Sequence, residues 1–533
     1  MTLRALAAIA LIVLAACVPT AHIDVPSAPN AVLRLAISTD PHSLNPLLAQ
    51  SIQENEVLRL MYDPLVACDA AGRPAPALAL VVPSRANGGI SNDGLTLTYH
   101  LRPGVLWHDG KPFTSADVAA SYRAIMDPRS VVQSRHGYDV VARVQTPDPL
   151  TVRFTLKRPF APFVGTVFAE SDAPHYVAPA RLVRNGLARS PLGSAAMGTG
   201  PYRLARWARG DRIELEANDA YWGGTPSIRR IVVRFINDEN TELVGLRSGD
   251  LDGIIGLSAN AAALAKAVPN VRVATSPLNA YWGILMNYAR GPTADRRVRR
   301  AIAEATDGEA FRLNVTHGLY MPPIADLPIT VWAADARLEP IRFDPGHARR
   351  LLAEAGYGKG HPLRLDLATL QSSQTHRVQA VALQSALRAL GIDVRVHAYL
   401  GNVFDAPPSE GGILARGRYD IAFYGWYAGM DPDDSGQFMC DQRPPAGYNH
   451  SFYCNAEMDA AQRTALGSYD DDVRRNAYSR IQALLLRDVP IAFLGSPVAV
   501  SALRADLDGF TPTLVTQTAN AHRWSIHTAS PTP

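Results

Sequence analysis

The 533-residue sequence contains few residues of several types, and each shortage excludes some classes of function. Charged residues make up 19% of the chain, below the roughly 25% that is usual in globular domains. The net charge is only +3. Because nucleic-acid binding needs a concentrated positive charge, this composition argues against nucleic acid as a partner. Lysine is scarce too, and we attribute the preference for arginine to genome base composition rather than to function.

Cysteine is also scarce, with four in the chain. A structural zinc site needs a second spaced pair of ligands, which is missing here. Cys440 and Cys454 flank the proline-rich stretch DQRPPAGYNHSFY, and thiols outside the cytoplasm tend to pair. We therefore expect a disulfide between Cys440 and Cys454, with Cys68 buried and free.

Long hydrophobic runs are absent, since a membrane-spanning helix needs about 20 apolar residues. The apolar stretch 5–15 follows Arg4 and has the length of a signal-peptide core. It ends in the residues LAAC, which resemble the lipobox of bacterial lipoproteins and would make Cys17 the lipidated first residue. We expect residues 1–17 to be a lipoprotein signal peptide and the proline-rich residues 18–31 to be a tether. The alternative is ordinary secretion, with Cys17 incidental.

Signatures of catalysis are missing as well. The sequence has no G-x-S-x-G elbow, S-x-x-K pair, H-E-x-x-H helix or P-loop. Residues 198–200 begin like a dinucleotide-binding fingerprint, but Pro201 follows and the third glycine is absent. His108 and Asp109 stand in WHDGKPF, which is ordinary turn chemistry. We therefore predict that the protein is not an enzyme.

What the sequence has is strand periodicity in its first half. Alternating apolar and polar residues predict five strands, at 33–37, 94–102, 151–156, 211–217 and 230–236. The ~500 residues that follow the predicted signal peptide and tether are too many for one hydrophobic core, so we expect at least two lobes.

The second half adds helices. Residues 376–390 and 471–487 carry apolar side chains near helical spacing, at Val378, Val381, Ala382, Leu387 and Leu390 in the first helix and at Val473, Ala477, Ile481, Leu484 and Leu485 in the second. Gly391 ends the first helix, and the alternation over 392–396 predicts a strand. This order is typical of an α/β crossover. In the arginine run 296–300, Val298 marks the apolar face of a helix, and we expect the arginines to be solvated.

Several stretches together resemble a known family. Residues 94–122, GLTLTYHLRPGVLWHDGKPFTSADVAASY, resemble the signature of the family 5 extracellular solute-binding proteins, the peptide-binding subunits of ABC importers. Further matches follow in the family's order: DPHSLNPLLA, GTGPYRLARWARGDRIELEANDAYWGG, ADRRVRRAIAEATD, YDIAFYGWYAGMDPDD and DVRRNAYSRIQALLLRDVPIAFL. Together they span the chain after the tether.

The resemblance implies an α/β chain with a two-lobed, periplasmic-binding-protein type II-like fold and an extra subdomain on the first lobe. We expect lobe I to comprise residues 32–62, 200–281 and 500–533, the subdomain residues 63–199, and lobe II residues 282–499. The ligand of such a protein lies between lobes that close around it. The implied protein is a monomeric binder without a cofactor, anchored at the extracytoplasmic face of the membrane, that captures peptides and delivers them to the permease of an ABC transporter.

The stretch YGWYAGMDPDDSGQ, residues 424–437, has two interpretations. Asp431, Asp433 and Ser435 match positions 1, 3 and 5 of a calcium-binding EF-hand loop. Position 12, however, is Gln442 instead of a bidentate glutamate, and the flanks lack the two helices. In the family this segment ends a strand at the ligand cleft. We therefore predict no metal here and a ligand-binding wall, formed by Gly425, Trp426, Tyr427 and Asp431.

The sequence departs from the family at one functional position. In the peptide binders, an aspartate three residues after this tryptophan pairs with the ligand's α-amino group, and here that residue is Gly429. Asp431 is the candidate replacement, and the competing interpretation is that it only caps the turn at Pro432. The departure keeps a non-peptide solute open, such as a nickel chelate, a sugar, haem or an opine. A secreted hydrolase and a sensory lipoprotein are alternatives of other classes.

Overall fold

The structure is a computed structural model that describes residues 31–49, 51–171, 174–371 and 374–526. The predicted signal peptide, Cys17 and all of the predicted tether except Ala31 lie outside the described residues. No helix in the described part of the chain is both long enough and apolar enough to cross a membrane. Below, lobe I, the subdomain and lobe II denote the three residue sets given above.

One 12-stranded sheet runs across the molecule. Its main path is β15 (Asp393–Tyr399), β14 (Arg364–Leu370), β16 (Ile421–Tyr427), β12 (Ala280–Met286), β17 (Ile491–Arg504), β10 (Gly253–Ile255), β1 (Val32–Ile37), β9 (Arg230–Phe235), β8 (Arg212–Ala217) and β7 (Tyr202–Ala208). Two further strands, β11 (Val271–Pro277) and β13 (Tyr320–Met321), pair with β17.

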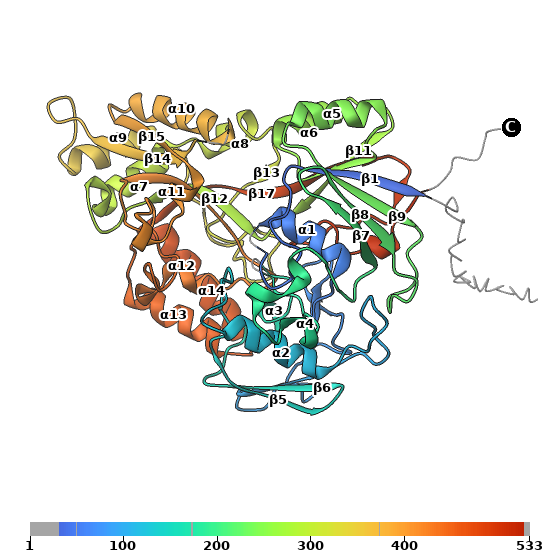
Figure 1. Ribbon diagram of the computed structural model, residues 1–533. Helices are drawn as coiled ribbons and strands as arrows, with labels where there is room; N and C mark the ends of the chain where they lie inside the picture. The colour runs from blue at the N-terminus through green and yellow to red at the C-terminus, as the bar shows by residue number, and fades with distance from the viewer. Residues whose placement is uncertain (1–30, 50, 172–173, 372–373, 527–533) are drawn as a thin grey trace, which may run out of the picture.

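Two adjacent crossings join the halves of this sheet. β17 is 14 residues long. Its first part, up to Gly495, pairs with β12, and its second part, from Val498, pairs with β11. The chain makes the other crossing between Pro277, the last residue of β11, and Ala280, the first residue of β12. Figure 1 shows β17 running between the two halves. Two short connections side by side are the geometry of a hinge.

Each half of the sheet is covered by its own helices. Those of lobe I are α1 (Ile52–Met61), α5 (Glu239–Ser248) and α6 (Ala259–Ala265). Those of lobe II are α7 (Arg296–Ala305), α8 (Gly308–Asn314), α9 (Pro345–Glu354), α10 (Gln374–Arg388), α11 (Gly401–Phe404), α12 (Ser435–Phe438), α13 (Ala456–Gly467) and α14 (Asp471–Asp488). The buried side chains form separate clusters in the two lobes, two in each.

The subdomain has its own sheet and core. Strands β4 (Thr96–His100), β6 (Thr151–Leu156) and β5 (Val141–Asp148) form a three-stranded sheet, next to α2 (Ser115–Met126), α3 (Phe163–Thr166) and α4 (Ala180–Val183). Small pairs are formed by β2 (Val66–Cys68) with β3 (Pro74–Pro76) and, near the C-terminus, by β18 (Leu507–Asp508) with β19 (Ser525–Ile526).

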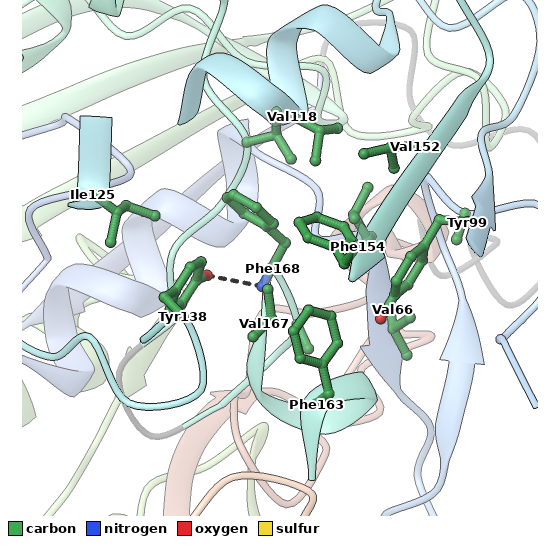
Figure 2. Close-up of a cluster of buried hydrophobic side chains, with 14 of the residues drawn as sticks. Val66, Tyr99, Val118, Ile125, Tyr138, Val152, Phe154, Phe163, Val167 and Phe168 are labelled. Atoms are coloured by element: carbon green, nitrogen blue, oxygen red, sulfur yellow. Dashed lines mark hydrogen bonds between the residues drawn. The ribbon is translucent and has the colours of Figure 1, made fainter. Parts of the chain in front are cut away.

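Aromatic side chains hold this core together, as Figure 2 shows. Phe154 is fully buried and meets the ring of Tyr99 edge-on at 5.9 Å. The Tyr138 hydroxyl accepts a hydrogen bond of 2.9 Å from the backbone N–H of Phe168. The same cluster includes Met430, Met439 and Leu466 of lobe II, so the subdomain packs directly on lobe II.

Besides Val473, which was predicted on the apolar face of α14 and is 42% exposed, the structure corrects two details of the sequence analysis. On α10, the predicted apolar positions Val378 and Val381 are 44% and 67% exposed, whereas Leu387 is buried as predicted. The buried face is a neighbouring stripe, which comprises His376, Gln379, Ala380, Leu383 and Leu387. Two residues of this buried face, His376 and Gln379, are polar, so a search for regularly spaced apolar residues did not find it.

The second correction concerns Arg299, which is not solvated but 1% exposed. Its guanidinium donates hydrogen bonds to the carbonyls of Asp488, Thr293 and Ala294 and lies 3.7 Å from the ring centre of Tyr288. An arginine on the buried side of α7 is tolerated because its donors are satisfied.

Candidate functional site

A cavity of about 880 Å³ lies between the subdomain and lobe II. The lobe I side of the protein contributes Ser51 and Ile52, and the subdomain contributes residues 132–136, 138–139, 165–166, 171 and 175. Lobe II contributes residues 405–408, 415, 425–427, 429, 431, 433–434, 436, 442 and 444–448 together with His450. The wall opposite lobe II is therefore built almost entirely by the subdomain.

The four residues predicted to bind ligand all line this cavity: Gly425, Trp426, Tyr427 and Asp431. Gly425–Tyr427 are the last three residues of β16, whose whole length pairs with β12. Beyond the strand, the amide of Asn279 donates to the Gly429 carbonyl at 2.8 Å, and the Ala428 N–H donates to the Asn279 carbonyl at 2.7 Å. These bonds turn the chain away from the sheet and into the cavity wall.

Successive side chains at the end of β16 lie on opposite faces of the strand, and both faces contribute to the cavity lining here. At Gly425, a Cβ atom would come within 2.5 Å of the Trp282 ring, so only glycine fits between the strand and that ring. The neighbouring Trp426 lies on the other face, where its ring centre is 5.3 Å from that of Tyr448. The Trp426 indole N–H has no hydrogen-bond partner among the described residues. The strand thus presents aromatic surface to the cavity.

The Asp431 carboxylate is held by the protein itself. One guanidinium nitrogen of Arg474, on α14, lies 2.7 and 2.8 Å from its two oxygens. The two side chains are only 12% and 7% exposed. Burial raises the pKa of the Asp431 carboxyl, and the Arg474 charge opposes that rise. Asp431 therefore lies at the predicted place, but its charge is already balanced.

The next two aspartates of the segment are engaged as well. Asp433 lies 2.7 Å from the Nε2 of His136 in the subdomain and accepts a bond from the Ser435 N–H. Burial raises the pKa of Asp433, but His136 and Ser435 outweigh it and lower the pKa to about 2. Asp434 accepts a hydrogen bond of 2.6 Å from the amide of Gln462.

Behind the wall, Asp434 also faces Asp326. Both carboxyls are buried, and burial raises the pKa of Asp326 to about 6. Burial and the neighbouring Asp326 raise the pKa of Asp434, which favours a proton held between the two groups. Among the described residues, no group of three or more His, Cys, Asp or Glu side chains is arranged to hold a metal ion.

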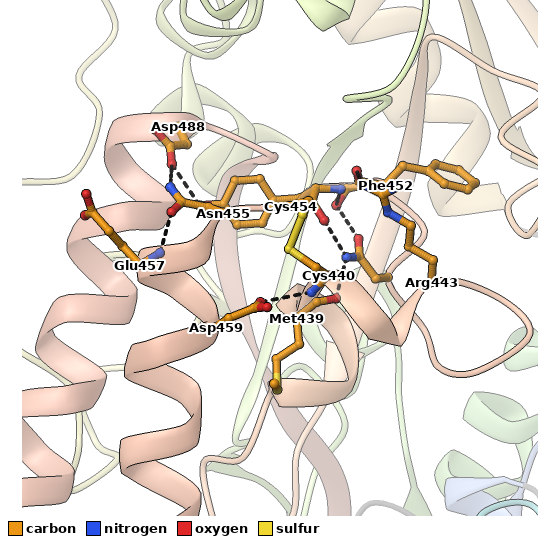
Figure 3. The surroundings of a disulfide bond; sticks show 12 residues. Met439, Cys440, Arg443, Phe452, Cys454, Asn455, Glu457, Asp459 and Asp488 are labelled. Atoms are coloured by element: carbon orange, nitrogen blue, oxygen red, sulfur yellow. Dashed lines mark hydrogen bonds between the residues drawn. A yellow bond between two sulfur atoms is a disulfide. The ribbon is translucent and has the colours of Figure 1, made fainter.

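A disulfide holds the remaining part of this wall, as Figure 3 shows. The sulfur atoms of Cys440 and Cys454 are 2.09 Å apart. The Cys440 N–H donates to the Asp459 carboxylate at 3.0 Å, which ties the bridge to α13. Between the cysteines, the chain carries Tyr448 and His450 into the cavity. Cys68 is free and buried, and burial raises the pKa of its thiol to about 12.

Sequence reasoning missed much of the lining. Asp405, Tyr448 and His450 belong to loops without a motif, and the subdomain wall around His136 comes from a distant part of the chain. The one sequence signal that could have found Tyr448 is an aromatic residue inside the loop between Cys440 and Cys454. The contribution of His136 depends on packing across 297 positions of sequence, which no local pattern reports.

A profile described as bacterial extracellular solute-binding proteins, family 5, middle region, matches residues 45–445 of the chain. Because this match spans well over half of its length, the chain belongs to that family. The chain is 29% identical, over 480 residues, to the glutathione-binding protein GsiB of Pectobacterium atrosepticum, with 89% of each chain covered. This relative is a binding protein rather than an enzyme.

Solved structures confirm the fold class. The ABC transporter substrate-binding protein CtaP from Listeria monocytogenes superposes with a TM-score of 0.82 at 23% identity, covering 94% of this chain and 100% of that one. NikA from Brucella suis, in complex with Fe(III)-EDTA, superposes with a TM-score of 0.82 at 24% identity, covering 93% and 100%. The protein thus has the mixed α/β, two-lobed fold that the sequence predicts, of periplasmic-binding-protein type II.

Proposed function

We propose that this protein is the solute-binding subunit of an ABC importer, which captures a short peptide outside the cytoplasm and delivers it to the permease. The observation that carries the proposal is the cavity of about 880 Å³ at the end of β16. Pockets for small molecules measure about 300–1,000 Å³, so the cavity suits a compact solute. No catalytic role and no cofactor are part of the proposal.

The alternative solute is not a peptide. Glutathione is itself a tripeptide, so the relative that binds it supports the peptide assignment. Against this, Gly429 stands where peptide binders of the family have an aspartate, and Asp431 is occupied by Arg474. Neither position therefore offers a free carboxylate that could pair with the α-amino group of a peptide, as the aspartate of the family's peptide binders does. A non-peptide solute, for example a metal chelate or an opine, is therefore the second candidate.

Closure around the solute follows from contacts between the subdomain and lobe II. The Ala161 N–H donates to the Leu466 carbonyl at 2.7 Å. The Tyr469 hydroxyl donates to the carbonyls of Gly94 and Phe160, each at 3.1 Å. Rotation about the two β-crossings would break these bonds and open the cavity, and a solute that touches both walls would favour the closed state.

We further propose that the mature protein begins at Cys17, is lipidated there, and acts as a monomer beside its permease. The lipobox-like residues LAAC and the proline-rich stretch after them support this. Stable membrane anchoring needs more than one acyl chain, and a multiply acylated Cys17 would supply them. Cys17→Ser should move the protein from the membrane fraction to the soluble fraction without changing its melting temperature. A variant that stays in the membrane pellet would contradict the anchor.

The importer role is tested by the solute itself. The protein is purified from its native host, denatured, and the released small molecules are identified by mass spectrometry. We expect one solute class at near-stoichiometric amounts, and uptake of that solute should fall when the gene is deleted. Finding no released solute and unchanged uptake would reject the importer role. Release of a solute without any loss of uptake would point to a sensory lipoprotein.

A further inference from the structure

The cavity is strongly acidic for a chain with a small net positive charge. Five of its lining residues are aspartates: Asp139, Asp405, Asp431, Asp433 and Asp434. They face one arginine, Arg135, and the lining includes no lysine and no glutamate. A cleft lined by one sign of charge concentrates solutes of the opposite sign.

Most of these charges are balanced within the protein. Asp431 is paired with Arg474, Asp433 with His136, and the pKa of Asp434 is raised by burial. Arg135 is also engaged: its guanidinium donates to three backbone carbonyls, those of Ile125, Asp127 and Ser130, at 2.9, 3.0 and 2.6 Å. The cavity therefore offers a solute carboxylate little to bind.

Asp405 differs from all of these. It directly follows the short helix α11, and its side chain is open to the cavity. No hydrogen bond or ion pair reaches its carboxylate from the described residues. Enclosure by the cavity wall without a counter-ion raises its pKa to about 6. Asp139, on the opposite wall, is less isolated because the ammonium of Lys157 lies 2.7 Å from its carbonyl oxygen.

Aromatic side chains line the same cavity as Asp405. Burial raises the pKa of the Tyr424 hydroxyl on β16, and the Asp405 charge raises it further. From the same strand, Trp426 packs against Tyr448, which in turn meets His450 at 6.4 Å. Burial lowers the pKa of His450 to about 4, so this ring is neutral at pH 7. Neutral aromatic faces attract cations.

We propose that the solute is an organic cation, whose ammonium or guanidinium group binds between the Asp405 carboxylate and the rings of Trp426 and Tyr448. This inference rests on the proposed function and narrows it. It assigns the counter-ion to Asp405 instead of Asp431, and it separates this protein from its glutathione-binding relative, because glutathione is an anion at pH 7.

Four probes test the proposal by isothermal titration calorimetry with solute-free protein, prepared by unfolding and refolding. Tri-alanine amide and agmatine are cations, one a peptide and one not, whereas N-acetyl-tri-alanine and glutathione are anions. We expect at least one cation to bind about tenfold or more tightly than both anions. Equal or tighter binding of an anion would overturn the proposal.

Two variants locate the contact. Because a hydrogen bond to a charged group is lost, Asp405→Asn should weaken cation binding by about ten- to a hundredfold. Asp139→Asn removes the same charge from the same cavity and should weaken it less than about threefold, since only the long-range field changes. Equal losses in both variants, or no loss in Asp405→Asn, would overturn the role of Asp405. Unchanged melting temperatures show that both variants fold.

The outcome in which no probe binds also counts against the inference. The solute that co-purifies with the protein tests the proposed function separately. If that solute is neutral or anionic, the protein is still a solute-binding protein, but the proposal that its solute is a cation is wrong.

Discussion

Two acidic segments on one wall of the cavity differ in how the fold treats them. Residues 431–434 carry three aspartates, and each is bound by another side chain, namely Arg474, His136 or Gln462. The loop at 405–408 carries one aspartate, and no side chain in the described part of the chain pairs with it. Both segments line the same cavity as the end of β16. An aspartate in a binding cavity is therefore a candidate ligand only when the protein itself has not already paired its charge.

The largest effect should come from removing the partner of Asp431. Arg474→Met leaves a buried carboxylate without a counter-ion, and breaking a buried pair in this way costs about 3–5 kcal/mol. Urea unfolding, followed by circular dichroism, measures the loss. Arg475→Met is the matched control, since this neighbour on α14 is exposed, forms a surface ion pair with Asp472 and lies 5.9 Å from the ring centre of Trp332.

The double variant Arg474→Met, Asp431→Leu should recover most of the lost stability, because replacing both partners by apolar groups leaves no unpaired charge. If Arg474→Met is as stable as the unmodified protein, Asp431 is not balanced by Arg474 and returns as a candidate ligand.

A somewhat smaller effect is expected from the disulfide that holds the wall next to residues 431–434. Cys440 and Cys454 are 14 positions apart, and closing a loop of about 15 residues contributes about 3 kcal/mol in the chain-entropy model. Reductant should lower the melting temperature of the unmodified protein but not that of Cys440→Ser, Cys454→Ser. Thiol titration of denatured protein that lacks residues 1–17 should find one thiol before reduction, Cys68, and three after it.

The smallest effect concerns Asp326, the carboxyl behind the acidic segment. Because burial raises its pKa from 3.8 to about 6, the stabilisation from the protonated form is complete below pH 4 and is lost as the pH rises through about 6. Asp326→Asn does not suffer this loss and should be more stable than the unmodified protein by about 1–2 kcal/mol at pH 8.

At pH 4 the Asp326→Asn variant and the unmodified protein should differ little. Asp441→Asn, at an exposed site, should show no difference at either pH. Greater stability of the unmodified protein at pH 8 would mean that the ionised carboxylate is stabilised by contacts other than those described.

The sequence predicted elements whose signal is local. β6 has the predicted bounds, and α14 differs from its predicted range by one residue, because alternation and helical spacing report such segments directly. The end of β16 at the cavity came from the family resemblance. Its aromatic face follows from alternation along the strand.

The rest depends on packing between distant segments. Arg474 and Asp431 are 43 positions apart, and no local sequence pattern around either residue predicts that they pair. In the sequence Arg299 is typical of a surface residue, and only the structure shows that its guanidinium donates hydrogen bonds to three carbonyls. Asp405 stands out only once the cavity is built and the other aspartates are seen to be engaged. Such features need coordinates because they consist of contacts rather than patterns.

The most direct test of the account is a crystal structure of the protein with the solute that co-purifies from its host. The account predicts a positively charged nitrogen at hydrogen-bond distance, about 2.7–3.2 Å, from the Asp405 carboxylate and against the rings of Trp426 and Tyr448, with Asp431 still bound to Arg474. A cation seated on Asp431 with Arg474 displaced, or an anionic solute beside Asp405, would contradict it.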